Sequence, residues 1–280
     1  SPEPPNRVPR MHNVVPGARA YITTLQTCYR RLHGRVLCEA RVVALTRGEG
    51  GTVSGVIAEI GGERRVFAAR KGVVLAAGDY THSTELIGRH LGVSYTEVEG
   101  INPKSTGDGH LLAEREGAKL LNMDVAYGPE LRFVPPAGRT FQQWLPSTGL
   151  AARFLGRLLP WIPDALMGAM IRRLLVTWQH PENTLFDDGA ILVNQQGERF
   201  CDERIWPDRE IATARQLGKI GYILLDERLI ERYSSWPHFI STAPKIAYAY
   251  VADYLKLRAD VAVSADSVEA IASARARLPA

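Results

Sequence analysis

ARKGVVLAAGDY at residues 69–80 and STGDGHLLAEREGAKLLNMD at residues 105–124 are the segments that decide the expected fold. In the first, the apolar run at 73–77 ends at Gly78, which predicts a buried strand followed by a glycine turn. In the second, residues 106–109 open a helix whose apolar positions repeat at helical spacing. The two segments together predict an α/β unit to which the rest of the chain is added.

The glycines and the helix start in these segments suggest a ligand site. Gly78 and Gly107 let the backbone approach a ligand closely, and the N–H groups that begin a helix favour anionic or polar groups. Loops after the carboxyl ends of parallel strands are where α/β folds bind ligands. The Asp108 carboxylate suits ligand hydroxyl groups better than a phosphate. Helix capping by Thr106 or Asp108 explains the presence of these residues at the helix start equally well.

The residues upstream predict a helix followed by a meander of strands. Residues 1–16 contain five prolines and are expected to form an extended arm. Apolar residues recur at helical spacing over 17–32, and β-branched residues follow over 35–47. Glycine pairs near residues 50 and 61 then predict turns between strands that lead into the run at 73–77. Downstream of Gly78, Thr81 or Ser83 is expected to cap a short helix.

The residues after Tyr127 have a different character. Residues 132–186 are rich in leucine, tryptophan and proline, which predicts short helices broken at the prolines. A strand, a turn and a second short element follow at 189–203, then a helix, a strand at 222–226 and another helix. The tail from 243 is expected to be mostly helical, with Ser264 or Asp266 as the cap of its last helix.

These patterns predict an α/β fold, α+β overall. Residues 1–126 are expected to form a partial Rossmann-like domain with a β-meander, and residues 127–280 an inserted α+β capping domain that contacts substrate and ends in a helical tail.

The composition is that of an ordinary soluble protein, with 45% hydrophobic and 23% charged residues and a net charge of +4. Three unpaired cysteines and the lack of a signal peptide predict the cytoplasm. No basic run suggests nucleic acid, no GxSxG motif suggests a hydrolase, and the scattered histidines predict no metal site.

Three segments, ARKGVVLAAGDY, STGDGHLLAEREGAKLLNMD and ILVNQQGERFCDE (residues 191–203), resemble the internal signatures of a known superfamily. It comprises the FAD-dependent fumarate reductases, succinate dehydrogenases and 3-ketosteroid dehydrogenases. The resemblance covers roughly residues 15–126 and 189–235, and it implies an FAD-dependent oxidoreductase acting on CH–CH bonds. No GxGxxG follows an initial strand, so the chain resembles the central portion of such a flavoprotein.

The resemblance implies a role for several residues at the FAD. Ala77 and Gly78 would lie near the pyrophosphate and adenosine, and Val42 would meet the adenine through its backbone. Thr106, Gly107 and Asp108 would approach the flavin.

In the predicted capping domain, the candidate catalytic residues are Glu203, Arg204 and Arg228. Trp144 and Trp206 are expected to line the substrate. The aromatic and aliphatic residues of this domain suit a small apolar substrate such as a 3-ketosteroid. Trp206 stands about where the ketosteroid dehydrogenases carry a catalytic tyrosine, which leaves a dicarboxylate of the fumarate or succinate type as the alternative.

A different class of function is also consistent with the sequence. Residues 153–178 carry aromatic and apolar residues beside arginines, as helices at a membrane surface do. The chain could then be a non-catalytic piece of a flavoprotein that binds a partner or a lipid surface.

Overall fold

The computed structural model describes residues 14, 16–138, 140–243, 247–274 and 278, so most of the predicted extended arm at 1–16 lies outside the described residues. The chain divides into two compact units. Residues Arg35–Pro129 form the first, which we call the meander unit. The described residues on either side of it form the second, which we call the helical unit.

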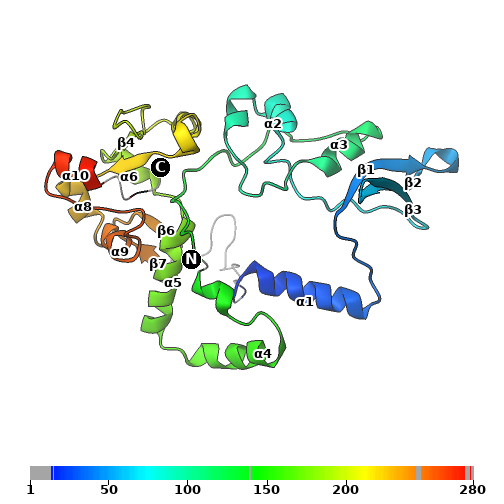
Figure 1. Cartoon of the computed structure of the whole chain (residues 1–280), viewed down its shortest axis with the longest axis horizontal. Helices are drawn as coiled ribbons and strands as arrows, with labels where there is room; N and C mark the ends of the chain where they lie inside the picture. The colour runs from blue at the N-terminus through cyan, green and yellow to red at the C-terminus, as the bar shows by residue number, and fades with distance from the viewer. Residues whose placement is uncertain (1–13, 15, 139, 244–246, 275–277, 279–280) are drawn as a thin grey trace. The chain divides into compact units, whose positions relative to one another are not determined.

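The meander unit contains a three-stranded antiparallel sheet in the order β1–β2–β3 (Figure 1). Glycine-containing turns join its strands, as the sequence predicts. Two α-helices follow the sheet, and Ser83 caps the first of them by accepting a hydrogen bond from the Leu86 N–H at 3.3 Å. The elements are β1 (Ala40–Arg47), η1 (Glu49–Gly51), β2 (Val53–Ile60), β3 (Glu63–Ala68), α2 (Thr84–His90), η2 (Val93–Glu97) and α3 (Asp108–Arg115).

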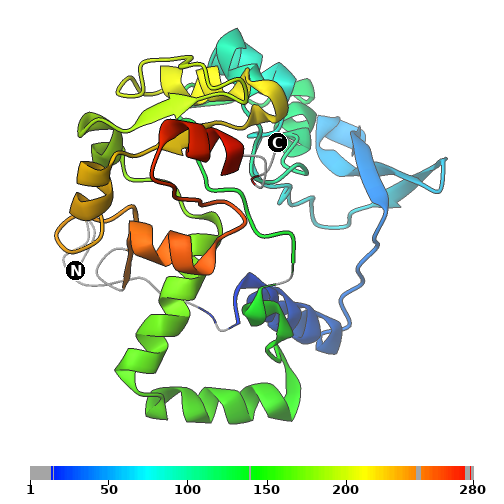
Figure 2. The same ribbon diagram turned by 60° about the vertical axis from the view of Figure 1, so that its left-hand side comes forward.

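The helical unit holds most of the helices and two short antiparallel sheets, β4–β5 and β6–β7, which Figure 2 shows from a second side. Prolines separate its long helices, as expected. Its elements are α1 (Ala18–Arg31), η3 (Phe141–Trp144), α4 (Gly149–Leu158), η4 (Leu159–Trp161), α5 (Asp164–Trp178), α6 (Asn183–Asp187), β4 (Ile191–Val193), α7 (Asp208–Ala214), η5 (Leu217–Lys219), β5 (Tyr222–Leu224), α8 (Glu227–Arg232), β6 (Ser241–Ala243), β7 (Ala247–Ala249), α9 (Val251–Leu257) and α10 (Val268–Ala274).

The core of the helical unit lies where α5, α6, α8 and α9 meet the short strands. Leu185 and Phe186 of α6, Leu192 of β4, Tyr233 after α8 and Tyr254 of α9 are buried there. Burying such side chains contributes about 1.5–3 kcal/mol each, so this cluster supplies much of the unit's stability.

Arg258 fixes the carboxyl end of α5 against this core. Its buried guanidinium donates to the carbonyl oxygens of Val176, Thr177 and Val134, and it also pairs with Asp260. The last carbonyls of a helix have no partner within the helix, so a buried arginine is a suitable donor for them.

The prediction of a buried strand at 73–77 was wrong. Residues 73–77 form no strand, and Val74 is 89% exposed. A strand needs a neighbour for its hydrogen bonds, and no described strand pairs with this run. The described strands pair only antiparallel, so the Rossmann-like part of the expected fold is not seen among the described residues.

The expected helix ends were also partly wrong. Neither Thr106 nor Asp108 caps α3, because Gly107 occupies the N-cap position in a left-handed conformation. The tail contains the hairpin β6–β7 as well as helices, and the Ser267 hydroxyl, in place of Ser264 or Asp266, accepts from the Ala270 N–H at the start of α10.

No helix in the described part of the chain is both long and apolar enough to cross a bilayer.

Gly107 is predicted to be intolerant of a side chain. Its φ is 73°, and a Cβ there would lie 2.4 Å from Cδ1 of the fully buried Leu86. We expect Gly107→Ala to destabilise the chain by about 2–4 kcal/mol, combining the left-handed strain with overpacking.

The matched control is Gly50→Ala, where φ is 78° and no atom lies within 4 Å of the added Cβ. It should cost only about 1 kcal/mol, since the strain alone remains. Urea unfolding of both variants measures the difference, and equal losses would show that the contact with Leu86 is unimportant.

Candidate functional site

Two loops of the meander unit are held together by backbone hydrogen bonds. The Gly107 N–H donates to the Asp79 carbonyl at 3.2 Å, and the His82 N–H donates to the Ser105 carbonyl at 2.9 Å. These bonds bring together the predicted cofactor residues Ala77 and Gly78 and the predicted residues Thr106, Gly107 and Asp108. We call the two loops, residues 77–82 and 105–109, the paired loops.

Backbone is accessible at the paired loops. Ala77 and Gly78 are both exposed, and Gly78 has a φ of 80°. A Cβ at Gly78 would meet only the Ser105 hydroxyl, at 4.0 Å, whereas a Cβ at Gly109 would lie 3.0 Å from that of Ala77. A ligand can therefore approach the main chain at Gly78, next to the first turn of α3.

The polar side chains around the paired loops are mostly engaged locally. The Asp79 carboxylate accepts from the N–H and hydroxyl of Thr81, and these bonds hold its pKa below the usual value. Asp108 accepts from the Thr106 hydroxyl at 3.0 Å and lies 3.5 Å from the Arg41 guanidinium. Its second oxygen is thus partly neutralised, which leaves a carboxylate suited to hydroxyl donors.

One buried nitrogen beside the paired loops has no partner among the described residues, namely His110 Nδ1. The His110 ring meets the Tyr80 ring edge to face at 5.5 Å. Since buried nitrogen without a partner is costly, His110 has hydrogen-bonding capacity that the described protein does not use. Neither His110 nor Asp79 was predicted from the sequence, because no motif spacing marks them.

Val42, the remaining predicted cofactor residue, is half-buried on β1, one residue after Arg41. A nearby cavity of about 410 Å³ is lined by apolar side chains of β1, β2 and α3 and by Leu75, with Glu116 as its charged member. Arg47 pairs with Glu116 at 2.6 Å. The meander unit thus offers exposed backbone for a polar group and an apolar hollow for a ring or another apolar group.

The FAD implied by the sequence fits these residues. A dinucleotide needs backbone N–H donors that no side chain covers. It also needs groups close by that accept hydrogen bonds from its ribose or ribityl hydroxyls. The paired loops offer exposed backbone at Gly78 and a carboxylate acceptor at Asp108.

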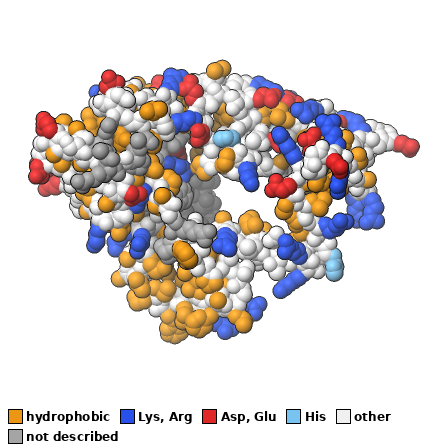
Figure 3. All heavy atoms as spheres, viewed as in Figure 1, with side chains coloured by type: hydrophobic (Ala, Val, Ile, Leu, Met, Phe, Trp, Pro, Cys, Tyr) orange, Lys and Arg blue, Asp and Glu red, His pale blue; other side chains and the backbone are white. Residues whose placement is uncertain are grey.

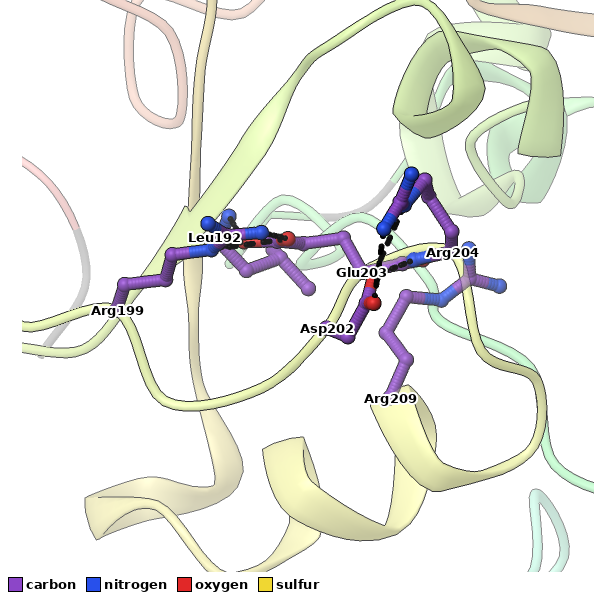
Figure 4. Close-up of polar contacts among 6 residues, drawn as sticks. All are labelled: Leu192, Arg199, Asp202, Glu203, Arg204 and Arg209. Carbon is purple, nitrogen blue, oxygen red and sulfur yellow. Dashed lines mark hydrogen bonds and ion pairs between the residues drawn. The ribbon is translucent and has the colours of Figure 1, made fainter.

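In the helical unit, Glu203 is bonded on both carboxylate oxygens (Figure 4). The Arg199 guanidinium donates to it at 2.7 Å, and the Leu192 N–H of β4 donates at 2.8 Å. Burial alone would raise its pKa, but these donors hold the pKa below its usual value. Glu203 is therefore an anion at neutral pH that ties the 199–203 segment to β4.

The other predicted catalytic residues are placed separately. Arg204 is exposed and pairs with Asp202 at 3.1 Å, pointing away from the Glu203 carboxylate in Figure 4. Arg228 donates to the Asp188 carbonyl at 3.0 Å. No hydrogen bond or ion pair joins Arg228 to Glu203 or Arg204 in the described parts of the chain.

Two further groups near Glu203 were not predicted. Arg209 is buried, donates to the Glu203 carbonyl at 3.1 Å and lies 4.5 Å over the Phe186 ring. It also pairs with the buried Glu210. Burial, together with the charge of Glu203, raises the pKa of the Cys201 thiol to about 11.

The predicted substrate-lining residues carry exposed aromatic rings. Trp206 follows the Glu203 segment and is 52% exposed, whereas Trp144 ends η3 and is 74% exposed. No described group of three or more histidine, cysteine, aspartate or glutamate side chains is placed to hold a metal ion.

A family model described as "FAD binding domain" matches residues 4–229. An NADH:acrylate oxidoreductase of Vibrio harveyi is 24% identical over 75% of this chain, and a 3-oxosteroid 1-dehydrogenase of Comamonas testosteroni is 31% identical over 34%. The chain covers 17% of the length of each. A solved flavocytochrome c3 fumarate reductase in its open conformation is 22% identical, with a TM-score of 0.47, over 75% of this chain and 30% of its own.

The match confirms two predictions made from the sequence. The chain belongs to the predicted flavoprotein superfamily, and FAD is the cofactor of the matched family.

Removing the charge of Glu203 is predicted to weaken folding. In Glu203→Gln the hydrogen bonds from Arg199 lose their charge assistance and one acceptor oxygen becomes a donor, and we expect the free energy of unfolding at pH 7 to fall by about 1.5–3 kcal/mol. The control, Glu231→Gln on the exposed side of α8, should change it by less than about 0.5 kcal/mol.

The loss should depend on pH in one direction. Because the folded pKa of Glu203 lies below the ordinary 4.5, its contribution is complete above that value and disappears as pH falls through the folded pKa. The free energies of unfolding of the unmodified chain and of Glu203→Gln, measured in urea, should therefore become equal in acid. A difference that stays constant down to pH 3 would contradict the assignment.

Proposed function

Because this chain belongs to the FAD binding domain family, we propose that it serves an oxidoreductase that transfers hydride between FAD and a bulky apolar ketone, such as a 3-ketosteroid. FAD, when bound, supplies the hydride chemistry. The residues of this chain would bind and orient the cofactor and the substrate.

The paired loops support a role in holding the cofactor. The exposed backbone at Ala77 and Gly78 suits a pyrophosphate or ribose, and the first N–H groups of α3 favour negative charge. The Asp108 carboxylate would accept hydrogen bonds from ribose or ribityl hydroxyls, since Arg41 and Thr106 hold it in place.

The observation that carries the substrate class is the pairing of the three arginines around Glu203 in the helical unit. A dicarboxylate is best bound by arginines that are free to form bidentate pairs. Each of Arg199, Arg204 and Arg209 is already paired with a carboxylate of this chain. A dicarboxylate would have to displace these partners, whereas an apolar substrate would not.

The exposed rings of Trp206 and Trp144 support the same substrate class, because flat apolar molecules bind against aromatic surfaces. Glu203 would act as a positioning residue, since its oxygens are occupied by Arg199 and Leu192. It would hold the segment that presents Arg204 and Trp206.

Binding of FAD tests the paired loops. In Gly78→Val the added side chain would stand over the exposed backbone, and we expect the Kd for FAD to rise at least about tenfold. The measurement is quenching of flavin fluorescence on titration with the purified chain.

The control is Gly62→Val, in the turn between β2 and β3. Its φ of 83° and its open surroundings impose the same strain without touching the paired loops. It should leave the Kd unchanged. Equal effects of the two substitutions, or no FAD binding by the unmodified chain, would contradict the proposed cradle.

Turnover tests the substrate class. The FAD-loaded chain should reduce an artificial dye in the presence of steroid ketones and show no reduction with succinate. Replacing Trp206 by serine should raise KM for the steroid by up to about tenfold, because an aromatic contact is lost.

Trp236→Ser is a matched control, since Trp236 is 63% exposed on the same unit but lies after α8. Turnover with succinate alone would favour the dicarboxylate alternative. The loss of turnover with every substrate, despite bound FAD, would favour a non-catalytic chain.

A further inference from the structure

The helical unit carries an exposed apolar surface along α4, η4 and the start of α5, residues 150–166, which we call the α4–α5 surface. Leu150 is 81% exposed, Phe154 65% and Trp161 83%. Hydrophobic side chains gather over α4 and the adjoining end of α5 in Figure 3. Large apolar side chains grouped in this way mark an interaction surface.

The apolar side chains of α4 form a stripe. Leu150, Phe154 and Leu158 are spaced four residues apart, so they lie on one face of the helix. None of the ten residues of α4 is fully buried. The opposite end of α5 differs, because Leu175 and Val176 are buried in the core and hold the surface to the unit.

The charges beside the stripe are of one sign. Arg153 and Arg157 are exposed and lie along one edge of it, three residues after Leu150 and Phe154 respectively. Arg172 and Arg173 are exposed farther along α5. Residues 140–178 contain a single acidic residue, Asp164. The surface therefore combines apolar bulk with positive charge.

This combination fits one kind of occupant. Arginine stems can lie on apolar surroundings while their guanidinium groups reach phosphates, and tryptophan is favoured where hydrocarbon meets polar headgroups. We propose that the α4–α5 surface binds the face of an anionic lipid bilayer. Leu150, Phe154 and Trp161 would enter the headgroup layer, and Arg153 and Arg157 would pair with lipid phosphates.

The apolar contribution is tested by sedimenting the 280-residue chain with vesicles of phosphatidylcholine containing phosphatidylglycerol. The unmodified chain should bind, and Leu150→Ser combined with Trp161→Ser should weaken binding at least about tenfold. The matched control combines Leu217→Ser and Trp236→Ser, which alter 73% and 63% exposed side chains of the same unit. It should bind as the unmodified chain does.

The charge contribution is tested with Arg153→Gln combined with Arg157→Gln. Each arginine near an anionic surface contributes about fivefold in affinity, so the double variant should bind on the order of thirty-fold more weakly. Added salt should weaken the unmodified chain more than this variant. Arg64→Gln combined with Arg65→Gln on β3 is the control, and it should leave the affinity unchanged.

Three results would overturn the proposal. One is equal binding to vesicles of phosphatidylcholine alone, and another is unchanged binding by the serine variant. The third is a chain that ignores vesicles but forms a dimer that the serine variant dissociates, which would make the occupant a second copy. The proposal does not rest on the proposed function, because the serine variant should keep the FAD affinity and thermal unfolding of the unmodified chain.

Discussion

The hydrogen bonds between the paired loops are the constraint on which the candidate cofactor site depends. They join the chain at Asp79 and His82 to the chain at Gly107 and Ser105. Without them, the exposed backbone at Gly78 and the start of α3 would have no fixed relation. Only glycine at 107 allows them, since Leu86 fills the space that a side chain would need. The absence of a side chain at position 107 therefore serves both the packing of Leu86 on α2 and the hydrogen bond that joins the paired loops.

Glu203 has a corresponding role in the helical unit. Its carboxylate accepts hydrogen bonds from Arg199, which follows the turn after β4, and from the Leu192 N–H within β4. Arg209 of α7 donates to its main-chain carbonyl. Buried carboxylates are tolerated where donors fully satisfy them. One buried anion therefore ties β4, the segment at 199–203 and α7 together.

Local signals in the sequence predicted most of the elements. Periodicity predicted α1, glycine turns predicted the meander, and Ser83 predicted a helix start, because each depends on neighbouring residues alone. The prediction of a strand at 73–77 failed because an apolar run indicates only that its side chains favour burial. It does not show whether a partner strand is present. β6 and β7 were missed because three residues are too few to show alternation.

In the candidate site too, features that depend on neighbouring residues could be predicted, and features that depend on tertiary packing could not. Glycines and Asp108 could be predicted from their motif, and the structure brings them together. The ion pair between Glu203 and Arg199 could not be predicted from the sequence, since residues 199–203 lie outside any helix and a four-residue spacing there does not imply contact. His110 gave no signal because its aromatic neighbour Tyr80 lies thirty residues earlier. Arg209 gave none because its burial over the Phe186 ring depends on tertiary packing.

The protonated thiol of Cys201 has a practical consequence. Maleimides and similar reagents attack thiolates, and a thiol with a pKa of about 11 is almost entirely unreactive at neutral pH. Cys28 and Cys38 are exposed, the former on α1 of the helical unit and the latter at the entrance to the meander unit. Spin labels would therefore attach at positions 28 and 38, on either side of the unit boundary at residues 34–35, and the dipolar coupling between them would report the distance between these two positions.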